Sequence, residues 1–139
     1  MRTLMAEDAS LAVDYAALSD FRHALRCFLL FSEEHAAEHG LTPQQHQALL
    51  AIRGAPDAQV TIGFIAERLV IKPHSASGLV DRLRALGLVT RVTAAQDRRQ
   101  ALIALTPLSR ALLARLSATH QEELRRLRPM FTALLTRLD

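Results

Sequence analysis

Apolar residues recur at steps of three and four through the N-terminal part of the chain. The positions that share this spacing are Leu11, Tyr15, Leu18, Phe21, Leu25, Phe28 and Leu29. Such a spacing gathers apolar side chains on one face of a helix. We therefore predict one long amphipathic helix over residues 8–39, which ends at Gly40.

A second helical pattern begins at a Thr-Pro pair. Thr42 suits the N-cap position, and Pro43 suits the first helical position. The pattern runs to about Arg53, and residues 54–57 break it. The apolar residues expected to be buried in this helix are Leu49, Leu50 and Ile52.

Two shorter helices are predicted next. Thr61 can cap the first of them, and Lys72-Pro73 opens the second, which Gly87 ends. The residues expected to face inward are Ile62, Ile65, Ala66 and Leu69 in the first helix, and Ala76, Leu79, Val80, Leu83 and Leu86 in the second.

Two β-rich runs, residues 88–92 and 101–105, flank a basic turn at residues 95–100. Two short helices that lead into a basic hairpin are the parts of a winged helix-turn-helix, which contacts duplex DNA with one helix and one loop. The expected fold class is therefore mainly α with a small β-hairpin wing.

A last helical tract starts at Thr106-Pro107, and Pro129 is expected to kink or split it. Its regularly spaced apolar residues are Leu108, Leu112, Leu116, Leu124, Leu127, Phe131, Leu134, Leu135 and Leu138.

The length suits a single domain over residues 1–139. We divide it into N-terminal scaffold and dimerisation helices at 8–54, the winged helix at 55–105, and C-terminal dimerisation helices at 106–139. The flanking helices hold more Leu and Phe than the core of one small winged helix needs. They either interlock with a second copy or pack on their own domain. We favour the homodimer, because a two-fold symmetric DNA site requires two DNA-binding units at a fixed spacing.

Positive charge is concentrated in the middle of the chain. Residues 60–110 hold eight Lys or Arg and three Asp or Glu, a net charge of +5, whereas residues 1–59 have a net charge of −4. Neutralising phosphates requires cations clustered in this way, although scattered surface charge is the simpler alternative.

Other classes of protein fit the sequence less well. No apolar run approaches the ~20 residues that span a bilayer, and residues 1–8 lack the apolar stretch of a signal peptide. Cys27 is the only cysteine, which suits the reducing cytoplasm. No cofactor or metal is expected.

Four short motifs carry a family resemblance. They are residues 41–45 (LTPQQ) with 48–50 (ALL), residues 65–69 (IAERL), residues 79–83 (LVDRL) with 87–89 (GLV), and residues 97–99 (DRR) followed by Leu105-Thr106. In this order and spacing, over residues ~20–120, the chain resembles the MarR (multiple antibiotic resistance regulator) family of bacterial transcription regulators.

The resemblance implies an architecture and a function. Members are two-fold dimers in which N- and C-terminal helices form a dimerisation domain and each subunit offers a winged helix to DNA. Members usually repress genes for efflux, stress or aromatic catabolism. They release a pseudo-palindromic operator when a small phenolic or anionic effector, an oxidant or a metal binds.

The predicted recognition helix, residues 73–84, is expected to enter the major groove. His74, Ser75 and Ser77 lie near its N-terminus, where side chains reach base edges and backbone N–H groups meet phosphate. The long cations expected on phosphate are Lys72, Arg82 and Arg84. Alternatively, the serines only cap or solvate the helix and His74 is only exposed.

The basic turn supplies the wing. Arg99 is expected to enter the minor groove, whose negative potential attracts a guanidinium. Arg98 is expected to meet phosphate. Asp97 is expected to hold an arginine in place, since phosphate repels a carboxylate. A solvated charged turn is the alternative.

Two positions depart from the family pattern. Gly78 stands where many relatives carry Arg or another polar base reader, so a reading side chain is missing. Phe64 stands where relatives often have Glu, so the capping box that Thr61 would form is lost. We expect Phe64 either to pack under the N-terminal helices or to be an exposed apolar contact.

The effector site is the least defined feature. Phe28, Phe31 and His46 could line a pocket between the dimerisation helices and the winged helix, where a protonated His46 could hold an anion. Ordinary core and surface positions are an equal alternative.

Two other sensor chemistries are weighed and not favoured. Cys27 could be oxidised if local charge favoured its thiolate, but a lone Cys on a helix rich in Leu and Phe is usually core. His35 and His39 share a helical face and could bind zinc only if His46 or His120 completed the site.

The sequence thus favours a dimeric DNA-binding repressor. A winged helix that docks on another protein would not need arginines at the turn or the local excess of positive charge. An enzyme is not expected, because no catalytic set or phosphate-binding loop stands out.

Overall fold

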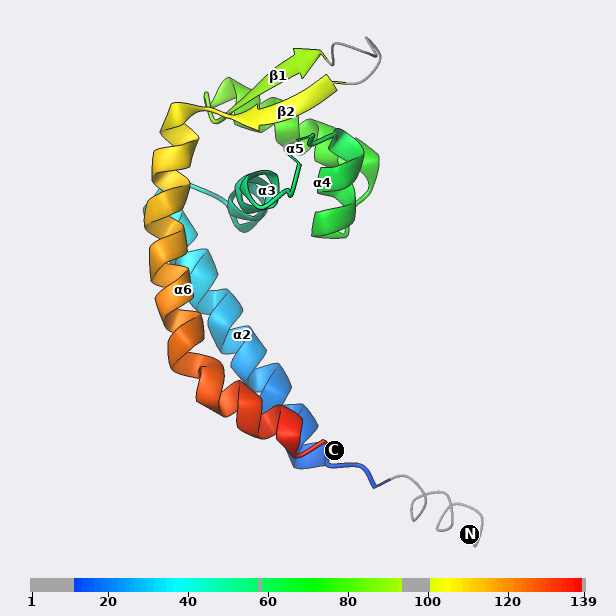
Figure 1. The fold of residues 1–139 in the computed structure, drawn as a ribbon, viewed down its shortest axis with the longest axis vertical. Helices are drawn as coiled ribbons and strands as arrows, with labels where there is room; N and C mark the ends of the chain where they lie inside the picture. Colours follow the sequence, from blue (N-terminus) through cyan, green and yellow to red (C-terminus); the bar gives the residue numbers. More distant parts are fainter. Residues whose placement is uncertain (1–11, 58, 94–100, 139) are drawn as a thin grey trace, which may run out of the picture. The chain divides into compact units, whose positions relative to one another are not determined.

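The computed structural model describes residues 12–57, 59–93 and 101–138. Its elements follow one another as α2 (Tyr15–Glu38), α3 (Pro43–Arg53), α4 (Ile62–Leu69), α5 (Pro73–Ala85), β1 (Val89–Thr93), β2 (Ala101–Leu105) and α6 (Pro107–Thr136) (Figure 1). The predicted fold class is confirmed. The chain forms two compact units, residues 32–120 and residues 1–31 with 121–139.

The first helix starts later than predicted. Residues 12–14 are not helical, and α2 begins at Tyr15; the predicted residues 8–11 lie outside the described part of the chain. Asp14 caps the helix, because its carboxylate accepts a hydrogen bond from the backbone N–H of Ala17 at 2.9 Å. This bond is the main reason why the pKa of Asp14 lies below its usual value.

The three threonine caps have the expected geometry. Thr42 forms a complete capping box with Gln45 at the start of α3. The Thr61 hydroxyl accepts from the backbone N–H of Phe64 at 3.1 Å, which leaves a cap without a box. The Thr106 hydroxyl accepts from the backbone N–H of Ser109 at 3.2 Å and donates to the carbonyl of Gly87 at 2.8 Å. The last bond ties the start of α6 to the end of the α5 segment.

A strained residue forms the turn between α4 and α5. Val70 has φ 55° and ψ 49°, the left-handed conformation, and its side chain is 90% exposed. Branching at Cβ makes this conformation costly for valine. The residue nevertheless ends α4 and directs the chain into α5 within a short turn.

The strands form an antiparallel pair with Val89 opposite Leu105 and Thr93 opposite Ala101. β1 is shifted by one residue from its predicted range. On its other edge, β2 receives a further backbone bond, from the N–H of Ile103 to the carbonyl of Val60 at 2.8 Å. The base of the hairpin is therefore held on both sides.

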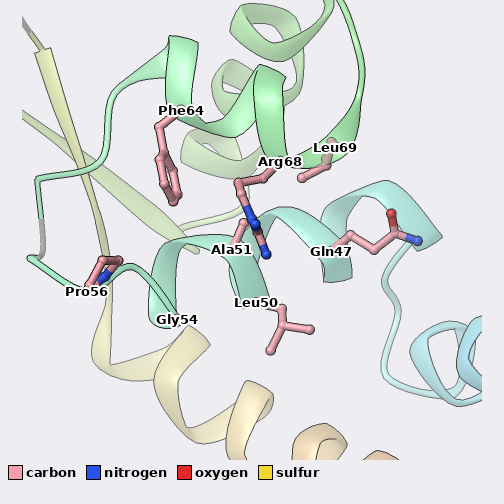
Figure 2. Close-up of a pocket in the computed structure, with 8 residues that line it drawn as sticks. All are labelled: Gln47, Leu50, Ala51, Gly54, Pro56, Phe64, Arg68 and Leu69. Atoms are coloured by element: carbon pink, nitrogen blue, oxygen red, sulfur yellow. The ribbon is translucent and has the colours of Figure 1, made fainter.

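Two apolar residues are exposed where burial was predicted. Leu50 is 47% exposed, because the buried side of α3 comprises Gln45, His46, Ala48, Leu49 and Ile52 and Leu50 lies outside that stripe. It borders a groove together with Phe64 (Figure 2). Leu86 is 53% exposed, since it is the C-cap of α5 and no longer follows the helical face.

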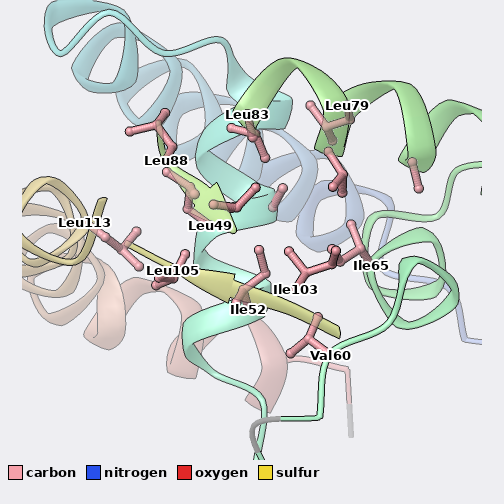
Figure 3. Close-up of a cluster of buried hydrophobic side chains, with 14 of the residues drawn as sticks. Leu49, Ile52, Val60, Ile65, Leu79, Leu83, Leu88, Ile103, Leu105 and Leu113 are labelled. Atoms are coloured by element: carbon pink, nitrogen blue, oxygen red, sulfur yellow. The ribbon is translucent and has the colours of Figure 1, made fainter. Parts of the chain in front are cut away.

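The core of the unit formed by residues 32–120 draws on every element of the winged helix (Figure 3). Its fully buried side chains include Leu49, Ile65, Leu79, Leu83, Ile103 and Leu116. Ile62 and Leu69, predicted to face inward, are partly buried against this core, as is Phe64. Burial of these residues fixes α5 with its opposite face toward solvent.

The other unit contains the N-terminal part of α2 and the C-terminal part of α6. Phe21 and Phe131 pack edge to face with centroids 5.8 Å apart, and Arg137 pairs with both Asp14 and Asp20. Pro129 lies inside α6, which continues through it, so the predicted split does not occur. None of the helices in the described residues combines the length and apolar character that a membrane span needs.

Candidate nucleic-acid interface

The residues predicted to contact DNA and described by the structure gather on one helix. Lys72 is the N-cap of α5, and its side chain forms no capping hydrogen bond. His74 and Ser75 are exposed in the first turn, whereas Ser77 is half-buried. Arg82 and Arg84 are exposed in the last turn.

The start of α5 has the features of an anion site. The first N–H groups of a helix have no partner within the helix, and here no side chain of the N-cap residue occupies them. Lys72 adds a positive charge at the same end. Phosphate can therefore approach the backbone of His74 and Ser75.

The solvent face of α5 carries a single acid, Asp81. Its carboxylate lies 4.0 Å from the guanidinium of Arg91 on β1. In the sequence, Arg91 contributes only to the local positive charge. The pairing joins residues on two elements, and only the packing of α5 against β1 reveals it. Arg91 offsets the one negative charge of this helix.

The residues predicted to form the tip of the wing are not among those that the structure describes. Asp97, Arg98 and Arg99 lie outside the described residues. The described hairpin ends at Thr93 and resumes at Ala101.

A groove lies between α3 and α4, on the same unit as α5 (Figure 2). Its volume is about 630 Å³, and its lining residues are Gln47, Leu50, Ala51, Gly54, Pro56, Phe64, Arg68 and Leu69. In Figure 2 Arg68 extends from α4 toward Ala51 on α3. The groove thus combines apolar walls with one guanidinium, an arrangement suited to an apolar anion.

His46 is not placed in this groove. It is buried on α3 and stacks on His120 of α6, with ring centroids 4.9 Å apart. Burial, and secondarily the charge of His120, lower the pKa of His46 below its usual value. This works against the protonated form that would hold an anion. Phe28 and Phe31, its predicted companions, belong to the other unit.

The histidines that could contribute to a zinc site make other contacts. His35 lies 3.4 Å from Glu38, and the Nδ1 atom of His39 lies 3.0 Å from the carbonyl of His35. Within the described residues, no three His, Cys, Asp or Glu side chains could hold a metal ion.

Cys27 is exposed rather than buried, so the expectation of a core cysteine is wrong. Its sulfur lies 3.6 Å from Nε2 of His23, one helical turn away.

Comparisons with known proteins support the winged-helix fold. Residues 39–100 match a family model described as the MarR family. MepR, a transcription regulator of the Staphylococcus aureus multidrug efflux pump MepA, is 20% identical with a TM-score of 0.73, covering 91% of this chain and 100% of its own.

A mutant of S. aureus MepR bound to an oligodeoxyribonucleotide is 21% identical with a TM-score of 0.69, covering 91% of this chain and 99% of its own. Wild-type apo MarR from E. coli is 23% identical with a TM-score of 0.67, covering 91% and 94%. At these identities the likeness establishes the fold. No curated protein matches the chain.

Proposed function

We propose that this chain is a winged-helix transcription regulator of the MarR family, whose model matches residues 39–100, and that it is a homodimeric, sequence-specific repressor that a small ligand releases from DNA. The observation that carries the proposal is α5, an exposed helix whose solvent side bears cations and hydroxyls. Regulators of this family bind DNA and are in general not enzymes. We expect this one to act in the cytoplasm, on a pseudo-palindromic operator.

In this proposal α5 enters the major groove. Its first turn places His74 and Ser75 at base edges, with Ser77 behind them, while Lys72 and Arg84 meet phosphates. The net charge of +5 over residues 60–110 supports this placement, because phosphate neutralisation supplies much of the binding free energy.

The direct test is fluorescence-anisotropy binding to the DNA upstream of the protein's own gene, with scrambled DNA of equal length as control, across a salt series. We expect tight binding that survives at physiological salt only on the native DNA. Equal and steeply salt-dependent binding to both would leave only the phosphate contribution. Absence of binding at low salt would favour a protein-docking module instead.

For the wing we propose that Arg99 enters the minor groove, Arg98 meets phosphate and Asp97 holds an arginine in place. Arg99→Ala should then weaken operator binding by about 1–3 kcal/mol. Arg115→Ala is the matched control, because Arg115 is exposed on α6, outside both the winged helix and the unit formed by residues 1–31 and 121–139. Unchanged affinity in Arg99→Ala would contradict the wing assignment.

We further propose that the unit formed by residues 1–31 and 121–139 mediates dimerisation. Its exposed apolar side chains support this, since such residues mark interfaces when they cluster. They include Leu18, Leu25, Leu29, Leu124, Met130 and Leu135. Sedimentation equilibrium should give a dimer, and footprinting should show half-sites about 10 base pairs apart. A stable monomer that protects one half-site would overturn this part.

For the effector we propose the groove between α3 and α4 and a small phenolic or anionic ligand. Arg68 would pair with the anion while Leu50 and Phe64 contact its apolar body. A screen of aromatic carboxylates for release of operator DNA tests the idea, with Arg68→Gln expected to abolish the response. A response unchanged in Arg68→Gln would place the effector elsewhere, for example at the site predicted around Phe28, Phe31 and His46.

A further inference from the structure

The middle of α5 lacks a side chain, and another residue occupies the space. A Cβ atom built on Gly78 would have one heavy-atom neighbour within 4 Å outside the local backbone, the Nη1 atom of Arg82, at 3.9 Å. Long helical side chains lean toward the N-terminus and cover the preceding turn. The guanidinium of Arg82 therefore lies over Gly78, about one turn nearer the N-terminus than its own Cα.

In the described residues, the N–H groups of the Arg82 guanidinium remain available to bind DNA. Within the described part of the chain, no hydrogen bond or ion pair holds the Arg82 side chain. Asp81 is adjacent in sequence, but neighbouring residues of a helix point in different directions, and its carboxylate faces Arg91 at 4.0 Å. Arg82 is exposed, so its N–H groups are directed to solvent on the same side as His74 and Ser75.

We propose that Arg82 reads a guanine in the major groove, in place of the side chain that Gly78 lacks. This inference rests on the proposed DNA binding. It replaces the phosphate contact that was expected for Arg82 from its being a long cation. Arginine pairs with O6 and N7 of guanine through two parallel hydrogen bonds, the commonest specific contact in this groove. Residues in the N-terminal half of a recognition helix come nearest the bases, and leaning over Gly78 brings the guanidinium there.

The test compares Arg82→Lys with Arg84→Lys on operators in which each base pair is changed in turn. Both variants keep the charge, but lysine lacks the planar pair of N–H donors with which arginine matches O6 and N7 of guanine, so its contact is weaker and less specific. For Arg82→Lys we expect roughly a 5- to 150-fold loss on the best operator and a flattened preference for guanine at one position in each half-site. For Arg84→Lys we expect the wild-type ranking of sequences. The wild-type ranking in Arg82→Lys would overturn the proposal.

Salt dependence separates a base contact from a phosphate contact. Arg82→Gln should weaken binding to the native operator far more than binding to scrambled DNA, because only the native operator loses a base contact. Uniform weakening on all sequences, with a salt slope smaller by about 1, would identify a phosphate contact and overturn the proposal. Failure of wild-type protein to distinguish native from scrambled DNA would instead refute the proposed function, before any variant is compared.

Two further variants test the position of the guanidinium. At 3.9 Å a Cβ makes only ordinary contact, so Gly78→Ala should keep the wild-type ranking. Gly78→Gln fills the space over residue 78 and should displace Arg82, changing the preference at the same operator position. Circular dichroism and urea unfolding establish that each variant is folded. An unchanged ranking in folded Gly78→Gln would overturn the placement over Gly78.

Discussion

Replacing Val70 by asparagine should stabilise the protein. Val70 adopts φ 55° and ψ 49° at the turn between α4 and α5, a conformation that costs an L-residue about 1–2 kcal/mol. Asparagine tolerates this region because its short polar side chain can bond locally. The change removes strain without altering the backbone path.

The side chain has little burial to lose. Val70 is 90% exposed, and full burial of a valine contributes about 1.5–3 kcal/mol, so its small buried fraction contributes about 0.2–0.3 kcal/mol. The balance is a gain of about 1 kcal/mol in the free energy of unfolding. Val70→Gly should gain less, because glycine adds about 0.5–1 kcal/mol of backbone entropy to the unfolded chain.

Urea unfolding followed by circular dichroism measures these differences. Val13→Asn is the matched control, because Val13 is exposed outside any helix or strand and has no positive φ; it should stay within about 0.5 kcal/mol of wild type. A Val70→Asn protein no more stable than wild type, beside a neutral control, would refute the assignment of strain to this turn.

Three other changes have defined outcomes. The lowered pKa of His46 means that protonation favours the unfolded chain, so the contribution of His46 to stability should be complete above the unfolded pKa, near 6.5, and should fall as the pH drops below it. In urea titrations from pH 7.5 to 5, His46→Gln should lose less stability than wild type on acidification. An identical pH profile in the two proteins would contradict this prediction. Leu83→Ala should cost about 2–5 kcal/mol, since Leu83 is fully buried, whereas exposed Leu86→Ala should cost much less in the same assay; equal losses would contradict the assigned core. Thr106→Ala should cost about 1 kcal/mol and Thr106→Ser little, as thermal unfolding would show; a loss as large in the serine variant would exclude the hydroxyl bonds as the cause.

The helices could be predicted because their signals are local. Thr42, Thr61 and Thr106 each lie at the start of a helix, and their hydroxyls bond backbone within three residues. The residues at which helices begin and end could not be predicted from the apolar spacing alone. Asp14 caps α2, so the helix begins at Tyr15, later than predicted. Leu86 is the C-cap of α5, so its side chain is not on the buried face of the helix.

The candidate interface was predictable in its location but not in its detail. Exposure of Lys72, His74 and Arg84 follows from the apolar stripe on the opposite face of α5. The pair between Asp81 and Arg91 requires the packing of a helix against a strand. The direction of the Arg82 side chain depends on an empty space one turn away, which residue type alone does not define.

The bond between the N–H of Ile103 and the carbonyl of Val60 bears on how the protein avoids aggregation. A hairpin of two strands has two open edges, and each can recruit a strand from another chain. In the described residues the segment before α4 covers the edge of β2 at Ile103, and the remaining strand carries Arg91, a charge that discourages pairing with a foreign strand. The hairpin can thus project from the body of the protein without acting as a template for intermolecular sheets.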